Sequence, residues 1–435
     1  MTTPRLAQAL ARLDALVNWE RRDRDASMRT SLEPIRGLLA LLGDPQRRFR
    51  AVHVTGTKGK GSTAALVEAG LRRAGFATGL YTSPHVERIH ERIRVRGLEL
   101  DDDVLAAALE TALDARGRAQ AGTPGAECTW FDLLTATAFL AFAEAGVEWA
   151  VVEVGLGGRL DSTNVVRGEV CVITNIDLEH QNVLGPTRRD IAREKAGILE
   201  QGCTLVTGVR AGEAPAEDDP APVIEAAATA LHARILRPPA AAPDASALER
   251  NLALARLVLD ELGRRGVMRK EGGQVSAAML DPATIAAARL PGRAERRRVG
   301  RTPVVLDAAH VPASVRLLLA ELSREREFSS PPVAILALGK DKDAPGILKA
   351  LAGRVDRVVC TTVALGPLRD AETLAQAART QGIVAETAAD PGRALARALD
   401  LTANDGWVLV LGSFYLAGAL RAQTSPPQRE SNERS

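Results

Sequence analysis

Apolar residues in the first half of the chain occur in short runs, and longer stretches of mixed polarity separate them. The run AVHVTG begins at residue 51 and is followed by STAALVEAGLRRAG, which has the composition of a helix. Further runs up to residue 210 read ATGLYTS, WAVVEVG, EVCVITNI and CTLVTGV. Alternation of this kind is typical of βαβ units, so it predicts a mostly parallel sheet.

A polar stretch rich in proline and alanine, residues 211–245, breaks this pattern, and ALERNLALARLVLDEL then predicts another helix. LPGRAERRRVG, residues 290–300, joins Pro-Gly to a run of charges, which predicts a linker without a buried element. The alternation then resumes in TPVVLDAAH, PPVAILALG, RVDRVVCTTV and GWVLVLGSF, with helical segments such as VPASVRLLLAELSRE between them.

A chain of 435 residues exceeds the size at which one hydrophobic core usually keeps growing, so two domains are expected. We predict an α/β fold whose N-terminal domain, residues 1–289, has the parallel sheet of a phosphate-loop ATPase. A smaller, Rossmann-like α/β domain would span residues 301–422, after the linker at 290–300. Residues 423–435 are polar and are expected to form a disordered tail.

Composition and charge narrow the function classes. Basic and acidic residues number 56 and 54, which is far from the basic field of a nucleic-acid-binding domain, so no nucleic acid is expected as a partner. The four cysteines are far apart and form no C-x-x-C, which favours the reducing cytoplasm over a zinc site or a disulfide framework. The N-terminal stretch MTTPRLAQALARLDAL predicts an amphipathic helix, and no apolar window predicts secretion or a membrane span.

The segment HVTGTKGKGST, residues 53–63, has the glycines and the lysine of a phosphate loop but not the spacing G-x-x-x-x-G-K-[ST]. Gly61 separates Lys60 from Ser62, where the pattern has the lysine and the hydroxyl adjacent. In a phosphate site the lysine would contact phosphate and the serine a magnesium ion. A glycine-rich turn with solvated lysines would look similar, so the loop alone leaves both interpretations open.

Two further candidates follow predicted strands. Glu153 closes the run WAVVEV, and His180 ends VCVITNIDLEH beside Glu179. Ligands of open α/β sheets bind at the carboxyl ends of strands, and an acid there is where phosphate-loop enzymes hold magnesium. A solvated strand-end glutamate and a structural histidine are the alternatives.

Lys195 lies in PTRRDIAREKAGILEQG, which predicts a helix of about fourteen residues with a capping-box start at Thr187 and Asp190 and an end before Gly202. Ile191, Lys195 and Ile198 are spaced so that the lysine falls on the apolar stripe. A buried ammonium must be paired, neutralised or modified, unless the side chain reaches past the stripe to solvent.

The second half of the chain contributes Asp307 and His310 after the run TPVVL, and GKDKD at residues 339–343 after VAILAL. Either pair of features alone could be a turn. Together they predict an acid, a histidine and a lysine at one edge of the second domain, where they could face a ligand in a cleft between the domains.

In this order, the motifs resemble the folylpolyglutamate synthase and dihydrofolate synthase family of ATP-dependent amide ligases, which is related to the Mur cell-wall ligases. The segments that carry the resemblance are HVTGTKGKGST, YTSPHVERIHERIRVRG, FDLLTATAFLAF, EVGLGGRLDSTNVV, IAREKAGIL, LPGR, DAAH, DKD and GSFYLAGALR. Gly61 is typical of the folate branch, since Mur ligases place Thr or Ser directly after the lysine.

The resemblance implies ATP and two Mg²⁺ ions as cofactors, and dihydropteroate or a folate, L-glutamate and ATP as substrates of a monomeric enzyme. The implied catalytic residues are Lys60, Lys195, Asp307 and His310. The implied nucleotide-binding residues are Gly56, Thr57, Gly59, Lys60, Gly61, Ser62, Thr63, Asn251, Arg293 and Asp307, and the implied metal-binding residues are Ser62, Glu153, His180 and Lys195. A carbamate on Lys195 would make it an anion, and the substrate would meet Arg92, Thr129, Phe131 and Asp161.

The sequence also departs from the family pattern. Lys58 stands where the family has asparagine, Glu179 where it has aspartate, and Asp132 where it has glutamate. Ala308 and Val311 alter the common D-G-A-H-N motif, and Ala247 and Leu248 replace a His-Gln pair. The predicted reaction is the addition of L-glutamate to dihydropteroate or to folates through an acyl phosphate. A Mur-type ligase of UDP-linked precursors and a paralogue that binds ATP or folate without ligating are the alternatives.

Overall fold

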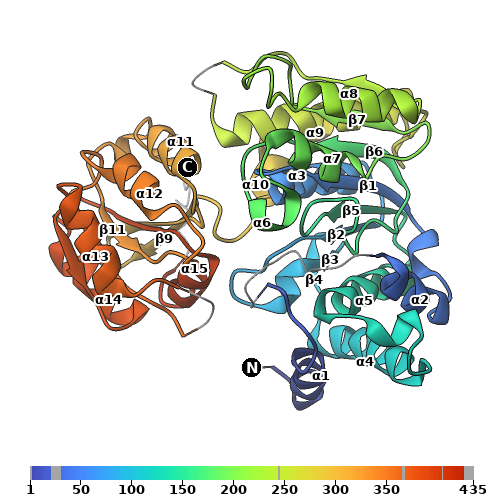
Figure 1. Cartoon of the computed structure of the whole chain (residues 1–435), viewed down its shortest axis with the longest axis horizontal. Helices are drawn as coiled ribbons and strands as arrows, with labels where there is room; N and C mark the ends of the chain where they lie inside the picture. The colour runs from blue at the N-terminus through green and yellow to red at the C-terminus, as the bar shows by residue number, and fades with distance from the viewer. Residues whose placement is uncertain (1, 21–30, 243–244, 365–367, 404, 426–435) are drawn as a thin grey trace, which may run out of the picture. The chain divides into compact units, whose positions relative to one another are not determined.

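The computed structural model of the chain describes residues 2–20, 31–242, 245–364, 368–403 and 405–425 (Figure 1). The chain forms two compact units. The first comprises residues 1–85 and 89–289, and the second comprises residues 86–88 and 290–435. Each unit is built around its own sheet, and the α/β class predicted from the alternating pattern is confirmed.

The first unit contains an eight-stranded sheet in the order β4-β3-β2-β5-β1-β6-β7-β8. The six strands from β2 to β8 in this order run parallel, while β3 and β4 continue the sheet antiparallel beside β2. The strands are β1 (Arg50–Thr55), β2 (Thr78–Tyr81), β3 (Ile93–Val95), β4 (Leu98–Glu99), β5 (Trp149–Glu153), β6 (Gly168–Ile173), β7 (Thr204–Thr207) and β8 (Arg234–Leu236).

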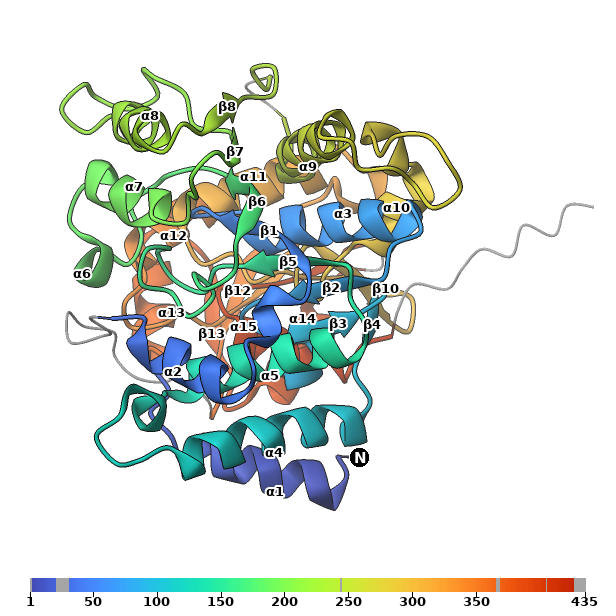
Figure 2. The same ribbon diagram turned by 90° about the vertical axis from the view of Figure 1, so that its right-hand side faces the viewer.

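Helices cover both faces of this sheet, which is why its central strands read as nearly continuous apolar runs. Ala51 of β1 and Val152 of β5 belong to a core with α1 (Pro4–Asp14), α2 (Glu33–Leu41), α4 (Asp102–Arg118) and α5 (Trp130–Glu144). On β6 and β7 a second core contains α7 (Arg188–Ala196) and α8 (Ala221–Ala230), and α6 (Gln181–Leu184) precedes α7. Figure 2 shows the strands between α7 and α8 on one side and α3 (Lys60–Arg73), α9 (Ala247–Arg264) and α10 (Pro282–Ala287) on the other.

β1 is the strand that organises the unit. It pairs with β5 on one side and with β6 on the other, and all three run parallel, so their carboxyl ends meet at one edge. The order of strands reverses around β1, which is the position where open α/β sheets bind ligands.

The second unit has a six-stranded sheet in the order β13-β12-β11-β14-β10-β9, parallel except for β9. Its strands are β9 (Glu295–Val299), β10 (Thr302–Leu306), β11 (Val333–Leu336), β12 (Arg357–Cys360), β13 (Ala385–Thr387) and β14 (Val408–Leu411). One face packs on α11 (Pro312–Leu322), α12 (Ala344–Leu351) and α13 (Ala371–Thr380), and the other packs on α14 (Pro391–Leu401) and α15 (Phe414–Arg421).

A segment from early in the sequence belongs to this second unit. Val86 packs into the core with Leu416, Ala417 and Leu420 of α15, and a Cβ atom built on Gly418 would lie 2.0 Å from the Val86 carbonyl oxygen. Residues 86–88 are therefore part of the second unit, although both flanking stretches belong to the first.

Two of the predicted boundaries need correction. The charged stretch predicted as a linker forms β9, because an edge strand leaves its arginines room to reach partners: Arg296 pairs with Glu325 and Arg298 with Glu327. The beginning of the predicted tail is ordered, since Ser425 and Arg298 exchange two backbone hydrogen bonds of 2.8 and 2.9 Å. The stretch 211–245 contains α8 and β8, which complete the first sheet. Residues 426–435 of the predicted tail lie outside the described residues.

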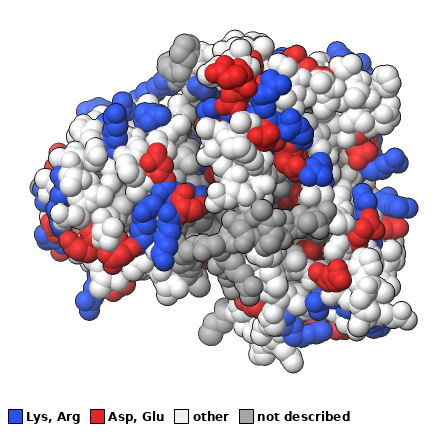
Figure 3. Space-filling view, viewed as in Figure 1, with Lys and Arg blue, Asp and Glu red and all other residues white. Residues whose placement is uncertain are grey.

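Charge and polarity over the described residues agree with an ordinary globular surface. Figure 3 shows basic and acidic side chains intermingled on the face in view. Cys128, Cys171, Cys203 and Cys360 are buried free thiols. In the described part of the chain, helices that combine the length and the apolar character needed to cross a membrane are absent.

Candidate functional site

The loop between β1 and α3 has the backbone of an anion-binding turn. Gly59 is the N-cap residue of α3 and has a φ of 82°, and Gly56 has a φ of 142°, a region that residues with a side chain rarely adopt. Lys60, Gly61 and Ser62 begin α3, where backbone N–H groups lack helical acceptors, and the buried Thr63 closes this turn by donating its N–H to the Gly59 carbonyl at 2.9 Å. The N–H groups and the helix dipole both favour an anion here.

Close packing also explains the two glycines. A Cβ atom on Gly56 would lie 1.8 Å from Oγ1 of Thr174, and one on Gly59 would lie 2.2 Å from Oδ1 of Asn251. Asn251, which the resemblance assigned to the adenine, is thus placed by α9 directly against the loop. The glycines allow β1, the segment after β6 and α9 to converge.

Residues that follow β6 hold the loop in place through its backbone. The side chain of Asn175 accepts from the N–H of Lys58 at 3.0 Å and donates to the Lys58 carbonyl at 2.9 Å. The hydroxyl of Thr174 donates to the same carbonyl at 2.6 Å, and Thr57 N–H donates to the Asn175 carbonyl at 3.0 Å. Sequence reasoning missed this role of Thr174 and Asn175, although both lie at a strand end, where it had sought chemistry.

Lys58 itself forms an ion pair with an acidic residue. Its Nζ lies 2.8 Å from Oε1 of Glu179, and this oxygen lies 3.9 Å from Nε2 of His180. Lys58 in the loop and Glu179 after β6, which both depart from the family pattern, are therefore ion-pair partners. The pair links the loop to the segment that carries His180.

Glu153 ends β5 and is buried at the shared edge of the sheet. Its Oε2 accepts a hydrogen bond of 3.0 Å from the backbone N–H of Ser83, a residue that sequence reasoning missed. A carboxylate and hydroxyl groups are ligands that suit Mg²⁺, which fits Glu153 and Ser62. Among the described residues no three His, Cys, Asp or Glu side chains form a metal cluster by themselves, so any metal site would need ligands of other kinds.

Lys195 is buried on α7, and its Nζ donates a 2.8 Å hydrogen bond to the carbonyl of Gly56. Burial first, and then the nearby Lys60 ammonium, lowers the pKa of Lys195 to about 7, while Glu179 opposes the shift. The lysine does not reach past the apolar stripe to solvent. The capping box of Thr187 and Asp190 is present, but the helix ends at Ala196 and not near residue 200, because the chain turns at Gly197.

Phe131 and Asp161, two of the residues predicted for the acceptor substrate, lie beside Gly155, which follows the end of β5. A Cβ atom on Gly155 would lie 2.7 Å from Cζ of Phe131 and 3.1 Å from Oδ2 of Asp161, so these two side chains flank one backbone position. Thr129 caps α5 and donates to Oδ2 of Asp132 at 2.8 Å, while Oδ1 of Asp132 accepts from Ser162 at 2.9 Å. The loop that carries Asp161 is thereby attached to the start of α5.

Arg92 is fully engaged with protein groups. Nη1 and Nη2 donate to the two carboxylate oxygens of Glu20 at 2.9 and 2.6 Å, and Nε donates to Nδ1 of His85 at 2.7 Å. The guanidinium also lies over the ring of Trp130, 5.0 Å from its centroid. Its assignment to the substrate stays a prediction, and a substrate would compete with Glu20 for it.

In the second unit, Asp307 follows β10 and accepts backbone hydrogen bonds from Ala294 at 2.7 Å and Ala309 at 2.6 Å. Burial raises the pKa of Asp307 above its usual value, and Arg293 opposes the rise. Nδ1 of His310 lies 2.8 Å from the carbonyl of Ala308, so in the neutral imidazole Nδ1 carries the proton. Arg293 and His310 both face the ring of Phe414, at 4.7 and 6.2 Å, a residue that sequence reasoning did not single out.

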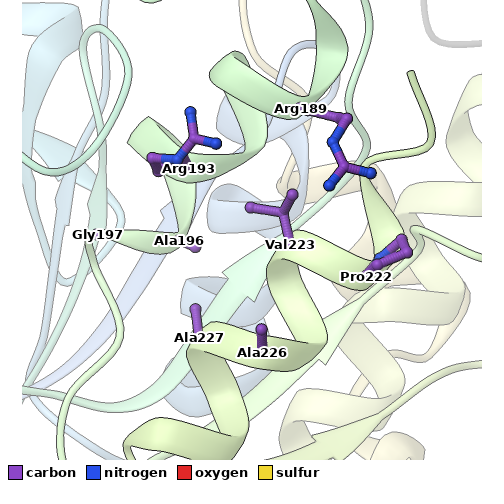
Figure 4. Close-up of a pocket in the computed structure, with 8 residues that line it drawn as sticks. All are labelled: Arg189, Arg193, Ala196, Gly197, Pro222, Val223, Ala226 and Ala227. Atoms are coloured by element: carbon purple, nitrogen blue, oxygen red, sulfur yellow. The ribbon is translucent and has the colours of Figure 1, made fainter. Parts of the chain in front are cut away.

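A hollow of about 440 Å³ lies away from these residues, between α7 and α8 (Figure 4). Its lining includes Arg189 and Arg193 of α7 and Pro222, Val223, Ala226 and Ala227 of α8. The predicted nucleotide, metal and substrate residues do not line it.

Comparison with known proteins identifies the class. The Mur ligase middle domain matches residues 54–207, and the Mur ligase glutamate ligase domain matches residues 292–414. Together the two matches cover more than half of the chain, so the fold and the loop are those of a Mur-type ligase.

Individual relatives specify the branch. The chain is 34% identical over 383 residues to the dihydrofolate synthase/folylpolyglutamate synthase of Mycobacterium tuberculosis, covering 80% of this chain and 77% of the relative. Escherichia coli FolC in complex with DHPP and ADP is similar with a TM-score of 0.78 and 28% identity, covering 96% and 97% of the two chains. The Yersinia pestis bifunctional folylpolyglutamate synthase/dihydrofolate synthase, complexed with AMPPNP and a Mn ion, gives 0.77 and 28%, with 96% and 97% covered.

This chain belongs to the folylpolyglutamate synthase/dihydrofolate synthase family. The resemblance inferred from the motifs is confirmed, and so is the class of ATP-dependent acid–amino-acid ligase. The relatives named above are folate enzymes, which favours the folate branch over a ligase of UDP-linked precursors.

Replacing Lys195 by Met should change how stability depends on pH. A pKa near 7 in the folded chain, against the ordinary lysine value of 10.5, means that between these pH values the unfolded chain binds more protons. The free energy of unfolding of the natural chain should therefore rise with pH in this window, by at most about 1.4 kcal/mol per pH unit, and this increment should be missing in Lys195→Met. Urea unfolding in CO₂-free buffer measures it.

The exposed Lys349 of α12 supplies the control for this experiment. Lys349→Met should leave the slope of stability against pH unchanged. Parallel pH curves for the natural chain and Lys195→Met would show that Lys195 is not held in a desolvated state.

Reversing the charge of Glu179 should loosen the loop. Glu179→Lys places two ammonium groups side by side and is expected to lower the free energy of unfolding by about 1 kcal/mol, because the pair is partly buried. The double exchange Lys58→Glu with Glu179→Lys should regain most of the loss in urea unfolding. If the double variant is as unstable as the sum of the two single variants, the pair does not hold the loop.

Proposed function

We propose that this chain uses ATP to join L-glutamate to a pterin-containing carboxylic acid, either dihydropteroate or a folate, through an acyl phosphate. The observation that carries the proposal is the meeting of three groups at one sheet edge: the glycine loop after β1, the buried Glu153 at the end of β5, and Lys195, whose Nζ bonds to the loop. Family membership supports the same reaction.

The loop residues Gly56 to Thr63 would hold the phosphates of ATP. Backbone N–H groups of the first turn of α3 would donate to phosphate oxygens, and Lys60 would place its ammonium beside them. Ser62, Glu153 and His180 would hold Mg²⁺, which neutralises charge on the transferred phosphoryl group when bound. The complex of the Yersinia pestis relative with AMPPNP and a Mn ion supports a nucleotide with a divalent cation.

Lys195 would act as a carbamate. An amine with a pKa near 7 is substantially uncharged at neutral pH, and only the uncharged amine adds to carbon dioxide. The carbamate would be an anion beside the loop, where it could serve a second metal ion. The Lys195–Gly56 hydrogen bond supports this position.

The acceptor would lie near Thr129, Phe131 and Asp161, with Phe131 offering a ring face and Asp161 a carboxylate. Its own carboxylate oxygen would attack the terminal phosphorus of ATP, and ADP would leave with the bonding electron pair. The amine of L-glutamate would then attack the carbonyl carbon of the acyl phosphate, and inorganic phosphate would leave.

The second unit would handle L-glutamate and the proton that its amine loses. Asp307 and Arg293 offer opposite charges for an amino acid or for phosphate, and Nε2 of His310 is the ring nitrogen that would accept a proton, since Nδ1 is committed to Ala308. The monomeric state and the cytoplasmic location inferred from the sequence stay predictions.

The decisive experiment is an ADP-release assay with each acceptor, with and without L-glutamate. We expect glutamate-dependent ADP release with dihydropteroate, with a reduced folate, or with both, and mass spectrometry should find the acceptor heavier by one glutamyl residue. Binding of ATP without glutamate-dependent turnover on any pterin would instead identify a non-catalytic paralogue.

Lys60→Ala should reduce turnover by a factor on the order of 10² or more, because the variant loses a cation at the transferred phosphate. Circular dichroism should show an unchanged fold, since Lys60 is only half-buried at a helix start. Lys349→Ala, on an exposed face of the second unit, is the matched control and should keep full turnover. Normal turnover of Lys60→Ala would mean that the loop is a turn and not a phosphate site.

A further inference from the structure

A buried histidine lies behind the acceptor site. His53 is an interior residue of β1 and has no exposed surface. Its Nε2 lies 2.9 Å from Oγ1 of Thr163, and both the hydroxyl and the N–H of Thr163 donate to Oδ1 of Asp161, at 2.6 and 3.0 Å. These three residues form a continuous chain from the middle of the sheet to the acceptor site.

The positions of the protons in this chain follow from the donors. Thr163 has one hydroxyl proton, and the 2.6 Å distance to Asp161 is typical of a hydroxyl donating to an ionised carboxylate. The Thr163 oxygen can then only accept from His53, so Nε2 of His53 carries the ring proton. Nδ1 of His53 has no hydrogen-bond partner among the described groups, as expected for a ring nitrogen without a proton.

The imidazole stays neutral in this position. Burial lowers the pKa of His53 to about 3, so the ring carries no second proton in the neutral pH range. If His53 did not donate, the Thr163 hydroxyl could turn toward Nε2 or lose its defined orientation. Asp161 would then lose its hydroxyl donor, while the backbone N–H groups of Thr163 and Leu156 would still donate to it, the latter at 2.9 Å from Oδ2.

The constrained carboxylate has a defined place. Oδ2 of Asp161 lies beside the Cα of Gly155, and the same backbone position is flanked by Phe131. An ionised oxygen next to an aromatic ring suits a planar heterocycle with N–H donors on its edge. Holding the carboxylate ionised and in one orientation therefore matters for recognition.

We propose that His53 is a positioning residue for the acceptor substrate: by donating Nε2–H to Thr163, it makes Thr163 donate to Asp161 and holds that carboxylate ready for the N–H groups of the pterin. This inference rests on the proposed function, because it takes Asp161 as the contact of the acceptor. It assigns a role to His53 and Thr163, which are not among the residues predicted to bind ATP or metal.

The test uses the full chain and separates acceptor binding from turnover. His53→Leu, which has a similar volume but no donor, should raise the KM for the acceptor about tenfold and change the KM for ATP less than twofold. His53→Gln keeps an N–H donor at a similar reach and should restore most of the acceptor KM. Thr163→Val should resemble His53→Leu, and Thr163→Ser should resemble the natural chain.

The double variant decides between positioning and packing. If His53 acts through Thr163, then His53→Leu with Thr163→Val should raise the acceptor KM no more than Thr163→Val alone. Effects that multiply, or equal changes in the KM values for ATP and acceptor, would overturn the proposal. If His53→Leu does not fold, the comparison of Thr163→Val with Thr163→Ser still decides, because equal acceptor KM values would remove the hydroxyl from the chain of donors.

Thr204 provides the matched control in the same unit. Its buried hydroxyl also donates to a carboxylate, Oε1 of Glu261 at 2.7 Å, so Thr204→Val tests the general cost of losing such a bond. It should leave the acceptor KM unchanged. Absence of glutamate-dependent turnover in the natural chain would contradict the proposed function. Turnover with the same acceptor KM in the natural chain and in the His53 and Thr163 variants would contradict this inference alone.

Discussion

The hydrogen bond from Lys195 to the carbonyl of Gly56 is the contact on which the candidate site depends. It joins α7 to the loop after β1 inside the protein, where an ammonium is costly and a pKa near 7 follows from burial. The loop can lie so close to its neighbours only because Gly56 and Gly59 have no side chains. Lys195, the anion-binding turn and the segment after β6 therefore depend on one another's positions.

Parallel strands explain why the chemistry gathers at one edge. β5, β1 and β6 are neighbours and end on the same side, so Glu153, the glycine loop and the segment from Thr174 to His180 are brought together. More than a hundred residues separate the glycine loop from that segment in the sequence. Around this edge the polar groups restrain one another: Asn175 and Thr174 hold Lys58, Ser83 holds Glu153, and Thr163 holds Asp161.

Much of the fold could be predicted because its signals are local. The apolar runs of β1, β5, β6, β10 and β14, the helix-forming composition of α3 and the amphipathic pattern of α9 are such signals. The edge strand β9 was missed because its arginines find partners outside the sheet, which a charge pattern cannot indicate. The early end of α7 was missed for a related reason. Gly197 packs so closely against Arg159, a residue distant in sequence, that a Cβ atom built on Gly197 would lie 2.4 Å from the Cβ of Arg159.

The sequence by itself determined the class of chemistry, since the glycine loop with Lys60 and Ser62, the strand-end acid and the lysine on an apolar stripe occur in the order of the family's motifs. Only the tertiary structure decided which groups interact: Lys58 pairs with Glu179, Arg92 pairs with Glu20, and His53 is linked to Asp161 through Thr163. The physical reason is that hydrogen bonds and ion pairs act over about 3 Å, and residues so far apart in sequence come within that range only once the sheet has formed.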